Sequence, residues 1–251
     1  MEAKAFFRHL LFLISVPKCP SCGTPLEEDD PALCKECRKS YEEIKEINCS
    51  LCARRLSRCN CTNRLLDRSY VHELIKVYRY RPQQPHLPSN DLIYSLKRHY
   101  RKDVISFLAD ELADAIRAGI PDLSQYAITS VPRRRASVVR YGYDHGEELA
   151  KAVAKRLSIV YKKLLLSKAK KAQKKLTTDE RRENASCVPL RGAVAPSKYM
   201  ILVDDIATSG SSLAAAATAL HKTGAKKIVG AVLAIAYKEQ NGVRNTKPID
   251  M

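Results

Sequence analysis

Tyr199–Ser212, Y-M-I-L-V-D-D-I-A-T-S-G-S-S, is the stretch that decides the fold of this chain. Its four consecutive apolar residues, Met200 to Val203, predict a strand buried on both faces. Asp204 and Asp205 follow, and a hydroxyl-rich turn then leads into the helix-forming run L-A-A-A-A-T-A-L. A second apolar run covers Ile228 to Ala236. The pattern therefore predicts a strand–loop–helix–strand crossover in a parallel sheet.

The turn has the residue types of a site for a phosphorylated sugar. Backbone N–H groups at a helix start are unpaired and lie at its positive dipole end, which favours a phosphate. Gly210 lets the backbone approach a ligand closely, and the neighbouring hydroxyls add donors. The two carboxylates can accept hydrogen bonds from the vicinal hydroxyls of a sugar. The nucleotide-binding pattern G-x-x-x-x-G-K-[ST] does not occur in the sequence.

The same stretch resembles the phosphoribosyl-pyrophosphate (PRPP) motif of type I phosphoribosyltransferases. That motif is an apolar quartet, two acids, three residues and then T/S-G-x-T/S. The resemblance implies that Asp204 and Asp205 are catalytic and hold the ribose hydroxyls, with Mg²⁺ bridging pyrophosphate and ribose oxygens. The implied PRPP-binding residues are Ile206, Ala207, Thr208, Ser209, Gly210, Ser211 and Ser212.

The length and net charge of the chain indicate its domain organisation and the class of partner that it favours. At 251 residues the chain can bury a full core, and we expect one main domain and a smaller module. The expected boundaries are 1–68 for an N-terminal helix with a Cys-rich zinc-binding module and 69–251 for a phosphoribosyltransferase-like domain. Lys and Arg number 44 against 27 acids, a net charge of +17. Such a balance favours anionic partners: nucleic acid, phosphorylated metabolites or an anionic membrane surface.

No run of the sequence reaches the roughly 18 apolar residues of a transmembrane helix. The nearest, Ala5 to Val16, is interrupted by Arg8 and His9, and no small-residue cleavage site follows it. We expect a helix docked on the domain, with a membrane-surface helix as the alternative. The predicted location is the cytoplasm.

Eight of the nine cysteines form four close pairs. Paired thiols on tight turns supply two corners of a tetrahedral Zn²⁺ site, so eight ligands suit two structural zinc ions. Iron–sulfur ligation and a disulfide framework are the alternatives. Joining the first pair to the second is the simplest arrangement, and a crossed arrangement stays open. The candidate ligands are Cys19, Cys22, Cys34, Cys37, Cys49, Cys52, Cys59 and Cys61.

Further strands and helices are predicted between the cysteines and the PRPP-like motif. Val71–Tyr80 alternates as a strand, and the proline-rich run 81–90 reads as a loop. Ser89 or Asn90 can cap a helix from Asp91 to about Tyr100. Lys102–Ala118 has the apolar spacing of an amphipathic helix.

A second buried strand, Tyr126–Val131, ends at Pro132 and three arginines, a suitable place for a diphosphate. A helix is expected from about Gly146 to Leu157. The strongly basic stretch Tyr161–Glu183 is predicted to be a mobile flap, because repulsion among its cations opposes fixed packing without an anion.

The order of these motifs resembles the ComF family of competence-associated, phosphoribosyltransferase-like proteins, over about Cys19 to Ala236. The motifs are the cysteine pairs, L-I-x-x-L-K, a V-P strand end, R-x-G-[FY], Q-x-x-L, R-x-x-N and V-D-D. The family usually reads R-G-F-N-Q where this chain has Asp144 and His145, which leaves an acceptor site open. The resemblance implies pyrophosphate contacts from Arg133, Arg134 and Lys97 and flap residues Arg140, Gln173, Arg181 and Asn184.

The implied function is transfer of phosphoribosyl from PRPP to an unknown acceptor, with release of pyrophosphate. Two other readings stay open. One is a non-catalytic accessory protein of DNA uptake that binds single-stranded DNA or the uptake machinery, and base stacking would then require aromatic residues among the cations. The other is a PRPP-sensing regulator that binds RNA.

Overall fold

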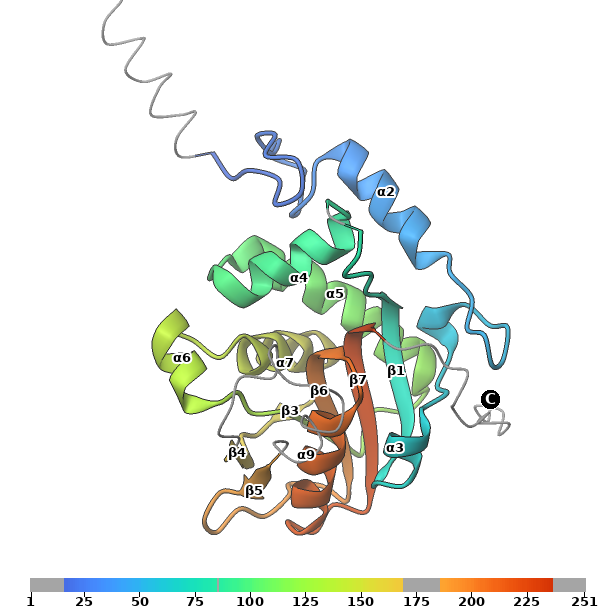
Figure 1. Ribbon diagram of the computed structural model, residues 1–251. Helices are drawn as coiled ribbons and strands as arrows, with labels where there is room; N and C mark the ends of the chain where they lie inside the picture. The colour runs from blue at the N-terminus through green and yellow to red at the C-terminus, as the bar shows by residue number, and fades with distance from the viewer. Residues whose placement is uncertain (1–15, 85, 169–185, 237–251) are drawn as a thin grey trace, which may run out of the picture.

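A parallel sheet forms the centre of the molecule, as the sequence predicts (Figure 1). Among the described residues it has five strands, four of which lie in the stretches that were expected to form strands. The computed structural model describes residues 16–84, 86–168 and 186–236. The sheet order is β1–β7–β6–β2–β3, and every neighbouring pair is parallel. The strands are β1 (Val71–Arg79), β2 (Tyr126–Ser130), β3 (Val160–Tyr161), β6 (Tyr199–Ala207) and β7 (Lys227–Ile235).

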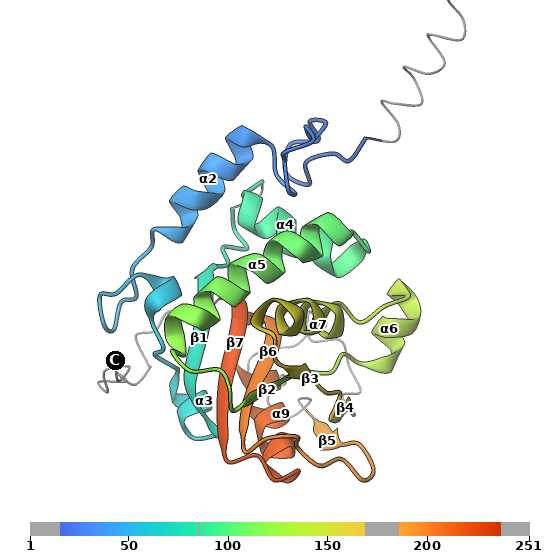
Figure 2. The same ribbon diagram turned by 180° about the vertical axis from the view of Figure 1, so that it is seen from behind.

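Helices cover both faces of this sheet, which explains the continuous apolar run in β6 (Figure 2). Alternate β6 residues point to opposite faces, so Ile201 lies in one core cluster and Met200 in the other. Helices α5 (Lys102–Gly119) and α7 (His145–Leu157) pack on the Ile201 face. Helices α9 (Ser211–His221) and α3 (Arg64–Asp67) pack on the Met200 face.

The cysteine-rich segment packs directly on this domain. Its helix α2 (Lys35–Lys45) buries Tyr41 completely. The Tyr41 ring meets Tyr78 of β1 and Phe107 of α5 edge-on, at centroid distances of 5.6 and 5.3 Å. The Tyr41 hydroxyl donates to Glu111 at 3.2 Å. The short 3-10 helix η1 (Leu56–Arg58) contributes the buried Leu56 to the core on the other face. The segment therefore shares both cores with the sheet.

Helix α4 (Pro88–Arg98) begins three residues before the predicted start at Asp91. Proline suits the first turn of a helix, because its missing N–H would have no helical partner there. Neither Ser89 nor Asn90 is the N-cap. The Asn90 amide instead donates to the Arg81 and Gln84 carbonyls, at 2.7 and 3.0 Å, and holds the preceding loop together.

Helix α6 (Arg135–Tyr141) was not expected after the arginine-bearing strand end. It ends at Gly142, whose φ of 78° is the left-handed conformation that closes many helices. Its arginines are thereby fixed on a helical turn beside the sheet.

The first part of the basic stretch is ordered, contrary to the prediction of a mobile flap over all of 161–183. Strand β4 (Leu165–Ser167) pairs antiparallel with β5 (Cys187–Pro189), and Lys168 N–H donates to the Ser186 carbonyl at 2.9 Å. Backbone pairing outweighs cation repulsion there. Gln173, Arg181 and Asn184 lie outside the described residues, as does nearly all of Ala5–Val16. Within the part of the chain that the structure describes, no helix is both long and apolar enough to cross a membrane.

Candidate functional site

A cavity of about 550 Å³ opens where β2 and β6 end, bordered by α4, α6 and the start of α9. In open α/β sheets, ligands bind beyond the carboxyl ends of the strands. A smaller hollow of about 440 Å³ lies at the amino ends of the same strands, and its lining residues include no carboxylate. The larger cavity is therefore the candidate site.

Asp205 is the electrostatic centre of the cavity. It is 6% exposed, and its Oδ2 accepts from Lys97 Nζ at 3.1 Å and forms a short contact with His145 Nε2. Burial alone would raise the pKa of Asp205, but Lys97 and then His145 outweigh it and hold that pKa well below its usual value. Asp205 is therefore ionised in the folded protein.

The pKa of Asp204 is shifted in the opposite direction, although Asp204 is adjacent to Asp205 in the chain. Burial is the main cause that raises the pKa of Asp204 well above its usual value, and the negative charge of Asp205 adds to it. Strand alternation sends the two carboxylates in different directions, and Lys97 forms its ion pair with Asp205. One acid is thus stabilised as a carboxylate while its neighbour resists ionisation.

The loop after β6 meets the start of α9 at Gly210. Gly210 is the N-cap, with a φ of 85°, and it offers no capping side chain. The Ser209 and Ser211 hydroxyls are 2.7 Å apart. The structure adds a second reason for glycine at this position, beside the expected close approach to a ligand. A Cβ there would be strained and would lie 3.0 Å from Leu66 Cγ, so α3 requires the glycine.

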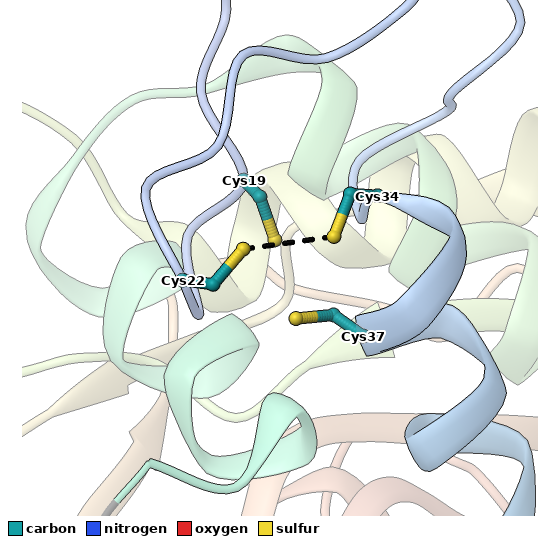
Figure 3. Close-up of side chains that lie close together, drawn as sticks. All are labelled: Cys19, Cys22, Cys34 and Cys37. Carbon is teal, nitrogen blue, oxygen red and sulfur yellow. Dashed lines mark hydrogen bonds between the residues drawn. The ribbon is translucent and has the colours of Figure 1, made fainter.

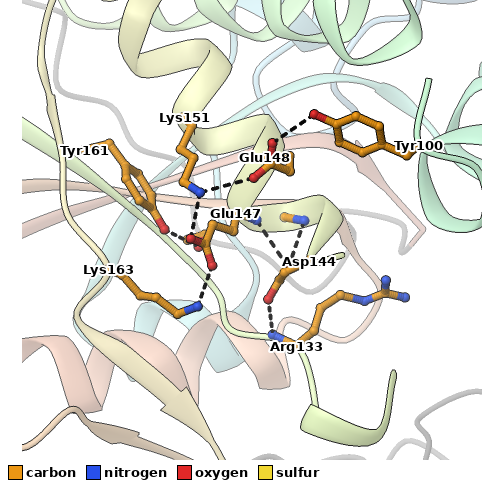
Figure 4. A network of polar contacts seen from close by, with 10 residues as sticks. Tyr100, Arg133, Asp144, Glu147, Glu148, Lys151, Tyr161 and Lys163 are labelled. Atoms are coloured by element: carbon orange, nitrogen blue, oxygen red, sulfur yellow. Dashed lines mark hydrogen bonds and ion pairs between the residues drawn. The ribbon is translucent and has the colours of Figure 1, made fainter. Parts of the chain in front are cut away.

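The arginine segment is held by the start of α7 (Figure 4). Asp144 caps this helix by accepting from Gly146 N and Glu147 N at 3.1 and 3.2 Å. Its second oxygen accepts from the backbone N–H of Arg133 at 3.2 Å. Asp144 therefore caps the N-terminus of α7, where its negative charge is favourable, and it holds the Pro132–Arg134 turn at the cavity.

Two arginines of the cavity wall lie on one aromatic ring. The guanidinium carbons of Arg133 and Arg140 are 5.4 and 5.5 Å from the Tyr141 ring centroid. Arg140, which we expected with the flap, is on α6 instead. Both arginines line the cavity.

Most of the candidate residues that the structure describes come together in this cavity. Ser209 is not in its lining, and its carbonyl accepts from Asn63 at 3.1 Å. The candidate residues that line the cavity are Lys97, Arg133, Arg134, Arg140, Asp204, Asp205, Ile206, Ala207, Thr208, Gly210, Ser211 and Ser212.

Sequence reasoning did not assign the roles of Asp144 and His145. The first could have been predicted, because Asp144 followed by Glu147 has the spacing of a helix-capping signal. The second could not, because His145 meets an aspartate 60 residues further along the chain. Tyr94 was also missed: it lines the cavity, is 49% exposed and has the Arg98 guanidinium 4.2 Å from its ring centroid.

The eight paired cysteines form two groups of four, joined in chain order. Figure 3 shows the sulfur atoms of the first group turned toward a common centre. Cys22 Sγ and Cys34 Sγ are 3.6 Å apart, far beyond a disulfide bond. A tetrahedral ion with Zn–S bonds of about 2.3 Å would separate its sulfurs by roughly 3.8 Å. The first cluster is Cys19, Cys22, Cys34 and Cys37, and the second is Cys49, Cys52, Cys59 and Cys61.

Each cluster favours a thiolate on one cysteine before any metal binds. A hydrogen bond with the Thr24 hydroxyl is the main cause that lowers the pKa of Cys22 to about 6. A hydrogen bond from Cys59 lowers the pKa of Cys49 to about 5. Thiolates are the form that binds metal, so both clusters fit a tetrahedral metal ion.

Comparison with known proteins shows what this chain is similar to. Residues 140–251 match the family model of the phosphoribosyl transferase domain. The chain is 23% identical over 207 residues to competence protein ComFC of Streptococcus pneumoniae, covering 81% of this chain and 87% of that protein. A solved structure of the allosteric regulatory enzyme of purine biosynthesis aligns with a TM-score of 0.37 and 17% identity, over 56% of this chain and 30% of that enzyme.

Proposed function

We propose that this chain is a phosphoribosyltransferase-like protein related to the ComF family, and that it binds PRPP in the cavity beyond β2 and β6. We further propose that it transfers the phosphoribosyl group to a nucleophilic acceptor and releases pyrophosphate. The observation that carries the proposal is that acidic, hydroxyl-bearing and basic residues line one cavity. Two carboxylates and a hydroxyl-rich helix start lie on β6 and α9, and the arginines follow β2.

Each part of PRPP would bind a different group of residues in this cavity. The 5′-phosphate would lie at the start of α9, where hydroxyls and the helix dipole stabilise an anion. The ribose hydroxyls would donate to Asp204 and Asp205. The pyrophosphate would meet Arg133 and Arg134, whose turn Asp144 fixes in place.

Lys97 and His145 have a second role in this arrangement. Lys97 forms an ion pair with Asp205, and His145 Nε2 contacts the same oxygen, so the carboxylate enters the complex ionised and oriented. A ribose hydroxyl can add to its oxygens without a new charge being buried. The expected pyrophosphate contact of Lys97 stays a prediction, and its Nζ is 3.1 Å from Asp205 in the ligand-free protein.

The transfer step breaks the bond between the anomeric carbon and pyrophosphate, which leaves with the electron pair. The acceptor forms the new bond on the opposite face and gives up its proton to solvent or to a nearby base. Positive charge develops at the anomeric carbon and ring oxygen, and adjacent carboxylates stabilise it. Mg²⁺ would neutralise the departing pyrophosphate, and the carboxylate and phosphate oxygens are the ligands that it prefers. The cysteine clusters would each hold a structural Zn²⁺.

Calorimetry with PRPP and Mg²⁺ tests the proposal. Binding should saturate, and at a hundred times Kd it should stabilise the folded protein by about 2.7 kcal/mol. Arg133→Ala should weaken binding by about ten- to hundredfold, because a charge-assisted bond to phosphate is lost. Arg191→Ala is the matched control, since this exposed arginine is outside the cavity lining.

Turnover is measured as pyrophosphate release when candidate bases and amines are supplied with PRPP. If millimolar PRPP with Mg²⁺ produces neither heat nor a thermal shift, the proposed function is wrong. Equal weakening by Arg133→Ala and Arg191→Ala would mean that binding depends on overall charge and not on this cavity.

Binding of single-stranded DNA is a second candidate, favoured by aromatic residues that the structure places beside cations. The exposed Tyr94 and its Arg98 partner form a stacking surface at the cavity, and the chain has a net charge of +17. Both residues lie on α4.

Tyr94→Ala should weaken single-stranded DNA binding by about five- to hundredfold, as expected for one lost base stack of about 1–3 kcal/mol. The salt slope should not change, because the number of phosphate contacts is the same. Tyr70→Ala is the control, since Tyr70 is exposed and stacks on His221 away from the cavity. Titrations of labelled oligonucleotide at several salt concentrations measure both quantities. Equal affinities of wild type and Tyr94→Ala would remove this surface from DNA binding.

A further inference from the structure

Helix α3 connects the second cysteine cluster to the loop of residues 206–212, which we call the phosphate-binding loop after its proposed role. Its N-cap, Asn63, lies two residues after Cys61. The Asn63 Oδ1 accepts from Leu66 N at 3.0 Å, and its Nδ2 donates to the Ser209 carbonyl at 3.1 Å. Only one orientation of the amide makes both bonds, so the contact fixes the side chain as well as the loop.

An apolar contact reinforces this connection. Leu66 is wholly buried, and a Cβ on Gly210 would lie 3.0 Å from its Cγ. The loop backbone therefore rests directly on α3. Neither Asn63 nor Leu66 lines the cavity, so both act on the loop from outside the ligand space.

The segment that leads into α3 is itself fixed by a buried lysine. Lys76 of β1 is fully buried, and its Nζ donates to the carbonyls of Cys61, Cys59 and Leu74 at 2.6, 3.3 and 3.3 Å. Four thiolates around a divalent ion have a net charge of −2, which a buried ammonium beside them offsets. Cluster, lysine and α3 thus form one continuous support under the loop.

We propose that Asn63 is a positioning residue for the phosphate-binding loop and that the second cysteine cluster acts on PRPP binding through it. The cluster holds the segment before α3, Asn63 holds the Ser209 carbonyl, and the loop presents its N–H groups and hydroxyls to the 5′-phosphate. The ligand part of this inference rests on the proposed function.

Asn63→Ser tests the proposal, because serine keeps a good N-cap but removes the donor to Ser209. Amide hydrogen exchange of a peptide covering 204–213 should speed up severalfold without any ligand. The PRPP affinity should fall about two- to tenfold, the loss of one hydrogen bond, while zinc content and melting temperature stay unchanged. Ser69→Ala is the matched control, since Ser69 bonds to Leu66 O at the opposite end of α3.

A contrast between the two clusters completes the test. Cys61→Ser should speed up exchange in 204–213 more than Cys22→Ser does, because Cys61 lies two residues before Asn63. The first cluster contacts α4 through the bond from Ser21 to Asp91, and it reaches this peptide through the Lys97–Asp205 ion pair on that helix. Unchanged exchange in both Asn63→Ser and Cys61→Ser would overturn the positioning role. Wild-type protein that fails to bind PRPP would overturn the proposed function and the ligand part of this inference. The positioning of the loop by Asn63 would still stand or fall on the exchange readout, which needs no ligand.

Discussion

Removal of metal from the two cysteine clusters is expected to unfold residues 16–68 and to lower the stability of the sheet domain. Metal binding to such sites supplies folding free energy, about 10–16 kcal/mol for a structural zinc at pH 7. Cys19 and Cys34 lie in the same core cluster as Tyr41 and Phe107. Unfolding of the cysteine segment would therefore remove packing from the core that it shares with the sheet. Elemental analysis should find two zinc ions per chain, and circular dichroism should show a large fall in melting temperature after chelation.

Single variants separate the two clusters. Cys34→Ser should reduce the zinc content to one per chain and destabilise the α2 segment. Cys187→Ser should keep both zinc ions, because this half-buried cysteine belongs to neither cluster. Iron in place of zinc, or a metal-free protein whose thiols all titrate freely, would contradict the assignment.

The elements whose signals are local could be predicted from the sequence. The apolar run of β6, the alternation of β1 and the apolar spacing of α5 each lie within one short stretch, and the structure has them within a few residues. The two groups of cysteines also follow chain order, the simplest of the arrangements considered.

Features that depend on contacts between distant residues could not be predicted. Tyr41 looks like one aromatic residue on a charged helix, and only the approach of Tyr78 and Phe107 makes it a core residue. The contact of Asn63 with Ser209 spans 146 residues. No short-range pattern records such a pair, because the hydrogen bond exists only once the sheet has formed.

The unequal environments of Asp204 and Asp205 lead to the last prediction. At neutral pH, Asp205→Asn should destabilise the unliganded protein by up to about 3–5 kcal/mol, because Lys97 and the buried His145 lose their carboxylate. Asp204→Asn should instead raise the melting temperature, since it removes a carboxylate whose ionisation burial and Asp205 oppose. Asp110→Asn, in an exposed pair with Arg156, should change stability by less than about 1 kcal/mol.

The pH dependence of these effects has opposite signs. The pKa of Asp205 is lowered by folding, so its stabilisation is present above the unfolded value of about 3.9 and is lost as pH falls further. The pKa of Asp204 is raised by folding, so its contribution is favourable below about 3.9 and is lost as pH rises through the folded value. The gain in Asp204→Asn should therefore disappear in acid, and the loss in Asp205→Asn should shrink there.

The affinity for PRPP should fall in both variants, although their stabilities change in opposite directions. Asp205→Asn loses a charge-assisted bond to a ribose hydroxyl, worth about 1.5–3 kcal/mol, so it should bind PRPP with Mg²⁺ about ten- to hundredfold more weakly. Asp204→Asn changes an acid that resists ionisation, so the loss of an ordinary hydrogen bond should weaken binding about two- to tenfold. Asp204→Asn should therefore be more stable than the wild type and bind PRPP less well. This combination is expected when a carboxylate is kept for function at a cost in stability. Thermal melts from pH 3.5 to 8 and calorimetry on the same samples measure both properties. If Asp204→Asn and Asp205→Asn lower the melting temperature equally, or bind PRPP as tightly as the wild type, the two aspartates do not have the separate roles proposed here.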